Sequence, residues 1–391
     1  MQSFGCLKVF VLILLLHLSS SIYSNGLRVG AQCTEDYLPL LKNKRVAVVA
    51  NQTTFIEQTH LVDSLLTLGI DIKKIFAPEH GFRGTGDAGE KIANNIDKKT
   101  GLPVLSLYGS QIKPTAEALK DIDIVIFDIQ DVGVRFYTYI STMHYIMEAC
   151  AEQKIPFLLL DRPNPNGFYV DGPVLEIKNK SFVGMHPVPL VHGMTIAEYA
   201  RMINGEKWLK NGIQCELYLV LCDGYEHSMR YELPIKPSPN LPNMRSVYLY
   251  PALGLFEGTV MSCGRGTDFP FQVVGHPLYG KKDFSFTPRS IPGASKYPPH
   301  EGKICYGLNL RDNAMFSVKD GVFNYQIIKY IYDNYPQKST FFNAFFLSLC
   351  GTDKCKTFFL SDTITDDMIF WKKDIIAFKE IRKKYLLYKD F

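Results

Sequence analysis

Three side chains that can exchange protons or bind anions, Glu79, His80 and Arg83, follow directly after a short apolar run at residues 75–77. A carboxyl group crowded by other acids has its pKa raised, and it can then donate a proton near neutral pH. An imidazole and a guanidinium beside it can bind a polar or anionic ligand. We therefore predict a catalytic role for Glu79 in a shared pocket. The alternative is an ordinary strand-end carboxylate satisfied by Arg83 or by a helix N-terminus.

The apolar runs around this stretch have the pattern of a parallel β-sheet. Val, Ile, Leu and Phe fill them, at residues 46–50, 75–77, 104–107, 124–127 and 156–160. Segments with a helical pattern separate these runs, at residues 60–68, 116–119 and 143–151. Strands that are apolar throughout are buried on both faces, as in α/β proteins. The sequence therefore predicts an α/β fold with a Rossmann-like N-terminal domain.

Polar residues follow each of the five apolar runs. The first of them are Asn51, Glu79, Tyr108, Asp128 and Asp161. Because the strands of a parallel sheet all point the same way, their carboxyl ends meet at one edge of the sheet. We expect these five segments, although distant in sequence, to line one crevice.

The fourth of these segments, residues 128–139, is unusually dense in polar groups. Asp128 stands at the strand end and is expected to hold loops by accepting backbone N–H bonds. Asp131, Arg135 and Tyr139 come after the strand, where a side chain can reach a ligand.

Two further polar residues are candidates for ligand binding. Asn164 stands in a turn rich in Pro and Asn, and its amide can both donate and accept, which suits a sugar hydroxyl or an acetamide. His192 ends another apolar stretch, where a purely structural histidine is the common case.

A proline-rich segment divides the chain. Residues 233–242 include four prolines, which cannot continue a helix or a central strand. We predict a Rossmann-like catalytic domain over residues 25–236 and a smaller α+β domain over residues 237–391. Glycine-flanked loops near Glu257 and Arg265 are expected to bend back toward the crevice.

The first residues have the layout of a secretory signal peptide. Residues 9–18 are apolar, Lys8 precedes them and serines follow. We predict cleavage after residue 24 and an exported protein, periplasmic or secreted. No second apolar run could span a bilayer, so no integral membrane segment is expected in the mature chain. The net charge of +4 is small for 391 residues, and a nucleic-acid partner is not indicated.

No motif for a cofactor or a metal is convincing. Residues 84–89 spell the glycine pattern of dinucleotide-binding proteins, but they follow the wrong strand and no helical pattern follows them, so a loop over the ligand is the better interpretation. The eight cysteines after residue 24 have no metal-ligand spacing, and Cys350 and Cys355 could form either a small disulfide loop or buried thiols. We expect no cofactor and no metal.

Six segments together resemble the exo-β-N-acetylmuramidase family, glycoside hydrolase family 171. They are residues 77–84, 128–139, 161–167, 191–194, 237–242 and 255–267. The resemblance implies a Rossmann-like domain joined to a smaller domain, with the cleft between them. It also implies release of N-acetylmuramic acid from the non-reducing ends of peptidoglycan fragments. The motif residues that it carries over are Glu79 as catalytic acid, with His80, Arg83, Asp131, Arg135, Tyr139, Asn164, His192, Asn240, Glu257 and Arg265 in the pocket.

The chemistry of glycoside hydrolysis leaves several alternatives open. It requires a protonated acid at the leaving oxygen, which is the role expected of Glu79, and a second group at the sugar carbon. Asp131 and Glu257 are candidates for the second group, and the acetamido group of the substrate is another. Arginine matches the lactyl carboxylate of muramic acid, so we expect one pocket arginine to bind it. Exo-β-N-acetylglucosaminidase activity, or sugar binding without turnover, are the alternative functions.

Overall fold

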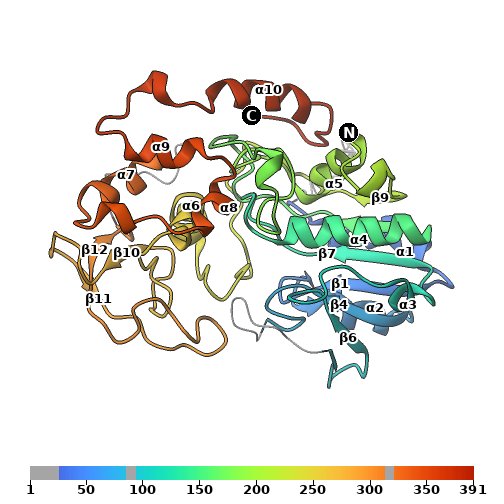
Figure 1. The fold of residues 1–391 in the computed structure, drawn as a ribbon. Coiled ribbons are helices and arrows are strands. Elements are labelled where there is room, and N and C mark those ends of the chain that lie inside the picture. The colour runs from blue at the N-terminus through green and yellow to red at the C-terminus, as the bar shows by residue number, and fades with distance from the viewer. Residues whose placement is uncertain (1–25, 85–93, 313–320) are drawn as a thin grey trace, which may run out of the picture.

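A seven-stranded sheet is the centre of the N-terminal half in the computed structural model, which describes residues 26–84, 94–312 and 321–391 (Figure 1). Its strand order is β5-β6-β4-β1-β7-β8-β9. β5 pairs with β6 in antiparallel orientation and the other six strands pair in parallel. The strands are β1 (Arg45–Ala50), β4 (Asp71–Ala77), β5 (Asn95–Ile96), β6 (Pro103–Ser106), β7 (Ile124–Asp128), β8 (Phe157–Leu160) and β9 (Leu217–Val220).

The strand order confirms the predicted Rossmann-like topology. The chain first builds the sheet outward from β1 through β4 to β6, and then returns to add β7, β8 and β9 on the other side of β1. This is the doubly wound arrangement, in which ligands bind outside the carboxyl ends of the strands where the winding reverses. The reversal lies at β1, between β4 and β7.

Helices cover both faces of the sheet because both faces are apolar. In β1, Val46, Val48 and Ala50 pack with α1 (Thr34–Leu41) and α2 (Leu61–Thr67). The alternate residues Ala47 and Val49 pack on the opposite side, in the cluster that includes α4 (Tyr139–Gln153) and α5 (Ile196–Gly205). Successive side chains of a strand point to opposite faces, so one apolar run supports two cores.

The C-terminal half is smaller and mixed. β10 (Val273–His276) and β11 (Ser285–Phe286) pair in antiparallel orientation with β12 (Cys305–Asn309). The helices around them are α6 (Met244–Leu253), α7 (Tyr325–Asp333), α8 (Phe345–Cys350), α9 (Lys354–Leu360) and α10 (Lys372–Arg382). This agrees with the α+β domain expected there. The boundary between residues 236 and 237 stays a prediction.

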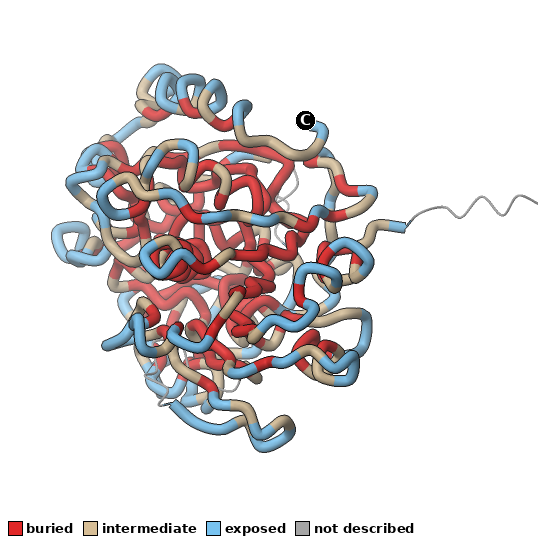
Figure 2. The backbone as a smooth tube through the Cα atoms, turned by 90° about the vertical axis from the view of Figure 1, so that its right-hand side faces the viewer, coloured by how far each residue is buried: buried red, intermediate tan, exposed pale blue. Residues whose placement is uncertain are grey.

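One hydrophobic core joins the two halves of the chain. Phe127 of β7 and Leu159 of β8 belong to the same buried cluster as Leu253, Ile331 and Phe346 of the C-terminal half. Figure 2 shows these buried segments passing through the middle of the molecule, with exposed segments at the periphery. The two halves therefore have no solvent layer between them at this core.

The end of the chain returns to the N-terminal half, where α10 lies above α5 (Figure 1). Arg382 donates two hydrogen bonds to the carbonyl of Gly193, at 2.6 and 3.0 Å. The Tyr388 hydroxyl donates to Asp161 Oδ2 at 2.6 Å and accepts from the Cys222 N–H at 2.8 Å. These polar contacts fasten the last residues to the carboxyl ends of β8 and β9.

The structure answers two questions from the sequence, the state of the cysteines and the presence of a membrane-spanning helix. The eight cysteines of the described residues are all buried and free, so Cys350 and Cys355 are thiols. No helix within the described ranges is long and apolar enough to cross a membrane. The predicted signal peptide, residues 1–24, and most of the glycine-rich stretch at 84–89 lie outside the described residues.

The Tyr388 contact predicts a stability change. In Tyr388→Phe the Asp161 carboxyl and the Cys222 N–H lose their partner, which should lower the free energy of unfolding by about 1–3 kcal/mol. Denaturant unfolding measures the difference. Tyr297→Phe is the matched control, because Tyr297 is 81% exposed and its change should stay within about 0.5 kcal/mol. Equal losses in both variants would contradict the anchoring role of Tyr388.

Candidate active site

The polar segments after the strands converge, as the parallel topology requires. Thr54 Oγ1, after β1, donates to the Asp128 carbonyl at the end of β7 (2.5 Å), and the Gln130 N–H donates to Thr53 Oγ1 (3.0 Å). Gln130 Nε2 in turn donates to the carbonyl of Pro163, after β8 (2.7 Å). Three loops that are distant in sequence are thus hydrogen-bonded to one another at one edge of the sheet.

A buried ion pair fixes two of these loops. Arg162 Nε and Nη2 donate to the two oxygens of Asp128 at 2.5 and 2.9 Å, and Asp128 is fully buried. Paired hydrogen bonds of this kind set both the distance and the plane of the two groups. Asp128 holds loops as expected, but through the guanidinium of Arg162 instead of backbone N–H groups.

Glu79 stands two residues after β4 and is half-buried. Thr138, the residue before α4, donates its hydroxyl hydrogen to Glu79 Oε2 at 3.1 Å. Glu79 also shares a hydrogen bond with Tyr108, the residue that follows the predicted third strand. Burial, followed by the negative charge of Glu79, raises the pKa of Tyr108, so this phenol stays protonated. Two hydroxyl groups therefore hold the Glu79 carboxyl group in place.

His80 has a backbone conformation that is rare for a residue with a side chain. Its φ is +70°, in the left-handed region, and the φ of Gly81 is +78°. Such a conformation costs a non-glycine residue on the order of 1–3 kcal/mol and is found most often at functional sites. The turn buries the imidazole, with its Nε2 3.4 Å from Ser238 Oγ. The strained turn thus directs two successive side chains, Glu79 and His80, into one space.

That space is a small pocket between the two halves of the chain, with a volume of about 50 Å³. Residues from the turn after β4, from the segment before α4, from the proline-rich segment and from the C-terminal half line it together. They are Glu79, His80, Phe136, Tyr137, Thr138, Ser238, Asn240, Leu241, Tyr250, Arg265 and Phe271. Four of the predicted site residues, Glu79, His80, Asn240 and Arg265, are among them, so the structure brings these four together.

Arg265 is the cation of the pocket wall. Its Nε donates to Glu257 Oε1 at 2.7 Å, and its guanidinium lies 5.0 Å from the ring centre of Phe271. Burial alone would lower the pKa of Arg265, but the Glu257 carboxylate raises it above the usual value, so Arg265 is charged. Glu257 is not one of the residues that line the pocket, but it contacts the pocket-lining Arg265 through this ion pair.

Asp131 is buried and is not among the residues that line the pocket. Its Oδ2 accepts the Gly133 N–H at 2.7 Å, while Oδ1 is buried and has no hydrogen-bond partner among the described residues. Burial raises the pKa of Asp131 to about 7. This carboxyl group is poised to titrate near neutral pH, but it does not line the space around Glu79.

Arg135 does not take the position expected for a ligand-binding arginine. It is fully buried, and its two terminal nitrogens donate to the carbonyls of Pro173, Val188, Leu349 and Cys350 at 2.6–2.9 Å. The last two carbonyls belong to the end of α8, so Arg135 fastens the C-terminal half to the sheet domain. The guanidinium of Arg135 is therefore hydrogen-bonded to backbone carbonyls inside the protein and is not placed to bind a ligand.

Arg83 is also engaged elsewhere. It pairs with Asp97 at 2.9 Å and with Asp63 at 3.5 Å, and its guanidinium lies over the ring of Phe82 at 4.3 Å. The ion pairs of Arg83 are therefore with Asp63 and Asp97 and not with Glu79, so the alternative of a simple Glu79–Arg83 pair has no support.

Three other predicted residues lie buried beneath the strand ends. Asn164 donates to the Met194 carbonyl and accepts the Asn166 N–H, both at 2.8 Å. His192 Nδ1 accepts the Met194 N–H at 3.2 Å, and Tyr139 packs against Tyr137 with their ring centres 4.8 Å apart. These residues shape the loops under the pocket, and none of the three lines it.

Several lining residues were not predicted as site members. Tyr137 and Thr138 stand inside the polar segment 128–139, so their position carried a signal. Tyr250 lies within α6 and Phe271 is buried before β10, where an aromatic residue has the pattern of ordinary core. The side chains that a second domain contributes to a pocket cannot be recognised from the periodicity of either domain.

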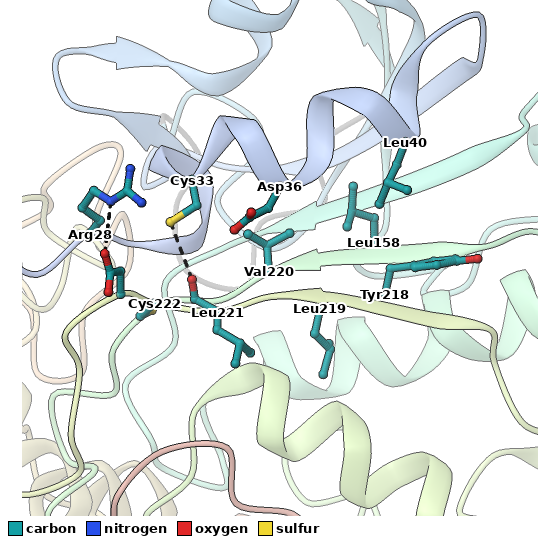
Figure 3. A pocket seen from close by; sticks show the side chains of 11 residues that line it. Arg28, Cys33, Asp36, Leu40, Leu158, Tyr218, Leu219, Val220, Leu221 and Cys222 are labelled. Atoms are coloured by element: carbon teal, nitrogen blue, oxygen red, sulfur yellow. Dashed lines mark hydrogen bonds and ion pairs between the residues drawn. The ribbon is translucent and has the colours of Figure 1, made fainter.

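A larger cavity, of about 430 Å³, lies elsewhere, along the edge strand β9 beneath α1 (Figure 3). Five of its eleven lining residues are aliphatic, and its charged residues include Arg28, which lies 3.5 Å from Asp223. β9 is four strands from β4 in the sheet, or about 19 Å at the usual strand spacing. If size alone decided, this larger cavity would be the candidate active site. The carboxyl, imidazole and phenol groups that suit catalysis, however, lie together at the smaller pocket.

The described residues include no cluster of three or more His, Cys, Asp or Glu that could hold a metal ion. The groups available for chemistry at the pocket are a carboxyl group, an imidazole, phenols and an ion-paired guanidinium. The fold and the site together define a two-domain Rossmann-like protein with a carboxyl group, Glu79, in a pocket between the domains.

The chain belongs to the exo-β-N-acetylmuramidase NamZ family. The sequence profile of the N-terminal domain of this family matches residues 46–245, and that of the C-terminal domain matches residues 248–388. A protein of Bacillus subtilis described as peptidoglycan β-N-acetylmuramidase NamZ is 41% identical over 375 residues, which cover 90% of this chain and 89% of that protein.

Solved structures have the same fold. A DUF1343 family protein from Bacteroides fragilis is 47% identical, with a TM-score of 0.86 over 94% of this chain and all of that one. A second protein of that family and organism is 28% identical, with a TM-score of 0.79 over 93% of this chain and 99% of the other. The two-domain α/β architecture is therefore shared by relatives across nearly the whole chain.

The buried Asp131 predicts a pH-dependent stability difference. The unfolded chain loses the Asp131 proton near pH 4, at about 3.9, whereas the folded chain keeps it to about pH 7. The contribution of Asp131 to stability therefore falls as pH rises through this window and is constant above it. Asp131→Asn avoids the loss, so its free energy of unfolding relative to the wild type should rise by on the order of 2–4 kcal/mol from about pH 4 to pH 8.

Urea unfolding of both proteins across this range measures the difference, and subtraction cancels the other titrating groups. A difference that stays constant from acid to neutral pH would contradict the raised pKa of Asp131.

Proposed function

We propose that this protein hydrolyses the terminal β-glycosidic bond of peptidoglycan fragments and releases N-acetylmuramic acid from their non-reducing ends, with Glu79 as the proton donor. Family membership and the activity by which the Bacillus relative is described support the reaction. The observation that carries the residue assignment is the placement of Glu79, the one carboxyl group among the described lining residues, at the carboxyl edge of the sheet.

The surroundings of Glu79 suit a general acid. Hydrolysis of a glycoside requires a carboxylic acid within hydrogen-bond reach of the leaving oxygen, in a fixed orientation. The Thr138 and Tyr108 hydroxyls orient the carboxyl group, and the strained His80 turn sets its direction. A proton delivered from Glu79 would leave with the sugar or peptidoglycan fragment on the departing side, while water supplies the hydroxyl group of the released muramic acid.

The candidates for the second group differ in their support. Glu257 is hydrogen-bonded to the pocket-lining Arg265, whereas Asp131 is buried and does not line the pocket. Glu257 is therefore the better placed of the two predicted carboxylates, and its place in an ion pair favours an orienting role over attack on the sugar. The substrate's acetamido group remains the other source of a nucleophile.

Muropeptides and other peptidoglycan saccharides are the substrates that this proposal implies, and they lie outside the cytoplasmic membrane. The signal-peptide pattern of residues 1–24 supports export to the periplasm or the medium. N-terminal sequencing of the exported protein tests this, with a new terminus after Ser24 expected and an intact Met1 as the contrary result.

Glu79→Gln tests the catalytic role. The amide keeps the shape of the side chain but cannot donate a proton as a carboxylic acid does, so turnover should fall roughly 100- to 10,000-fold with substrate binding largely retained. Product release from defined muramic-terminated saccharides, followed by mass spectrometry, measures turnover. Glu301→Gln, at an exposed glutamate, is the matched control and should match the wild type.

The same assay separates the alternatives. A sugar-binding protein without catalysis would release no product from any saccharide, and an exo-β-N-acetylglucosaminidase would release N-acetylglucosamine from glucosamine-terminated saccharides in preference. Full activity in Glu79→Gln would contradict the assignment of the proton donor while leaving the reaction itself intact.

A further inference from the structure

Arg265 is placed differently from the other two arginines predicted near the site. Arg135 is surrounded by four backbone carbonyls and Arg83 is paired with two aspartates, whereas Arg265 lines the pocket that holds Glu79. Its Nη1 is buried and has no hydrogen-bond partner among the described residues. A buried guanidinium nitrogen without a partner is costly, which calls for an explanation at this position.

We propose that Arg265, oriented by Glu257, binds the lactyl carboxylate of N-acetylmuramic acid and so selects muramic over glucosamine substrates. This inference rests on the proposed function and deepens it, because it names the residue that determines specificity. N-acetylglucosamine has the same ring and acetamido group but lacks the lactyl group, so the carboxylate is the chemical difference that a selective site can use.

The guanidinium is held so that one part of it stays available. Glu257 accepts from Nε at 2.7 Å, on one edge of the planar group, and Phe271 lies 5.0 Å away. Nη1 belongs to the other end of the guanidinium, which can form charge-assisted hydrogen bonds with a second carboxylate. The existing ion pair therefore positions Arg265 without using all of its donors.

The backbone on both sides of Arg265 is built for this position. Gly264 and Gly266 have φ values of +83° and +77°, which residues with a side chain rarely adopt. A Cβ atom at Gly264 would lie 2.7 Å from the Phe269 carbonyl oxygen, and one at Gly266 would lie 2.6 Å from the Arg289 carbonyl oxygen. The turn is thus closely packed on both sides, and the direction of the Arg265 side chain is fixed by the fold.

The size of the pocket fits a substituent and not a sugar ring. Its volume of about 50 Å³ is room for a few water molecules, at roughly 10–15 Å³ for each on this measure. A group of three or four heavy atoms such as a carboxylate matches this space, with the ring at its mouth. Arg265 gives the space a positive charge, and Asn240 and Ser238 add polar groups to its wall.

The charges of Arg265 and Glu257 together lead us to expect a moderate preference for muramic over glucosamine substrates. Glu257 partly offsets the charge of Arg265, so an incoming carboxylate gains hydrogen bonds to a charged donor more than long-range attraction. Hydrogen bonds to charged groups change binding by roughly 10- to 100-fold. Selection of the muramic sugar should be of this size, and it should depend on Arg265 and not on Arg83 or Arg135.

The test compares chromogenic β-glycosides of N-acetylmuramic acid and N-acetylglucosamine on the full-length mature protein. Arg265→Gln should lower kcat/KM on the muramic glycoside roughly 10- to 100-fold and change kcat/KM on the glucosaminide less than about 3-fold. Arg265→Lys should restore part of the muramic activity, because a lysine keeps the charge without the planar fork. Arg289→Gln, at an exposed arginine of the same domain that pairs with Asp268, is the control and should change neither rate.

Calorimetric binding gives a second measurement that does not need turnover. In a Glu79→Gln background, Arg265→Gln should weaken binding of free N-acetylmuramic acid and leave that of N-acetylglucosamine unchanged. Glu257→Gln provides a variant that keeps the arginine, and it should give a smaller loss with the same selectivity, since it only loosens the orientation of Arg265.

The outcomes are distinguishable. Equal losses on the two sugars, or no loss on either, would overturn the carboxylate-binding role while leaving the hydrolase proposal standing. A wild-type protein that cleaves neither glycoside and releases no sugar from peptidoglycan fragments would overturn the proposed function, and this inference with it.

Discussion

The common direction of the strands in the large sheet is the constraint on which the site depends. Six strands pair in parallel, so the chain must leave each of them at the same edge and cross back over a face of the sheet. Polar residues placed after β1, β4, β7 and β8 therefore meet without any local sequence relation. Because the winding reverses at β1, the loops on its two sides separate and leave room for a ligand.

That edge is completed by the C-terminal half of the chain. The continuous core and the carbonyl contacts of Arg135 hold α8 against the sheet domain, while Arg382 and Tyr388 fasten the chain end. Each of these groups would be costly to bury without its partner, so the relative position of the two halves is specific. Arg265 and Phe271 can then lie opposite Glu79 in a space of only about 50 Å³.

The strands of the sheet could be predicted because their apolar runs are a local pattern. Residues 46–50, 124–127 and 156–160 became β1, β7 and β8 to within a residue, and the convergence of their polar ends followed from topology. β9 was not predicted, although residues 217–222 form a continuous apolar run and the strand closes one edge of the sheet. The last helix, α10, ends at Arg382, after which the chain serves as an anchor.

The roles of individual side chains were harder to predict than the elements that bear them. The sequence places Arg83, Arg135 and Arg265 in similar polar stretches, and it contains no information about the carbonyls and carboxylates that surround each of them after folding. The partners of the three side chains in the folded protein differ. Arg83 pairs with aspartates, Arg135 donates to peptide carbonyls, and Arg265 lines the pocket. Asp131 likewise follows a strand end, but it is buried and does not line the pocket.

The most direct test of the central claim is a crystal structure of the Glu79→Gln variant with a muramic-terminated disaccharide. The account predicts the glycosidic oxygen at hydrogen-bond distance, about 3 Å, from the side chain of residue 79, with the sugar between the two halves of the chain. A disaccharide bound instead in the larger groove along β9, with residue 79 away from the glycosidic bond, would contradict it.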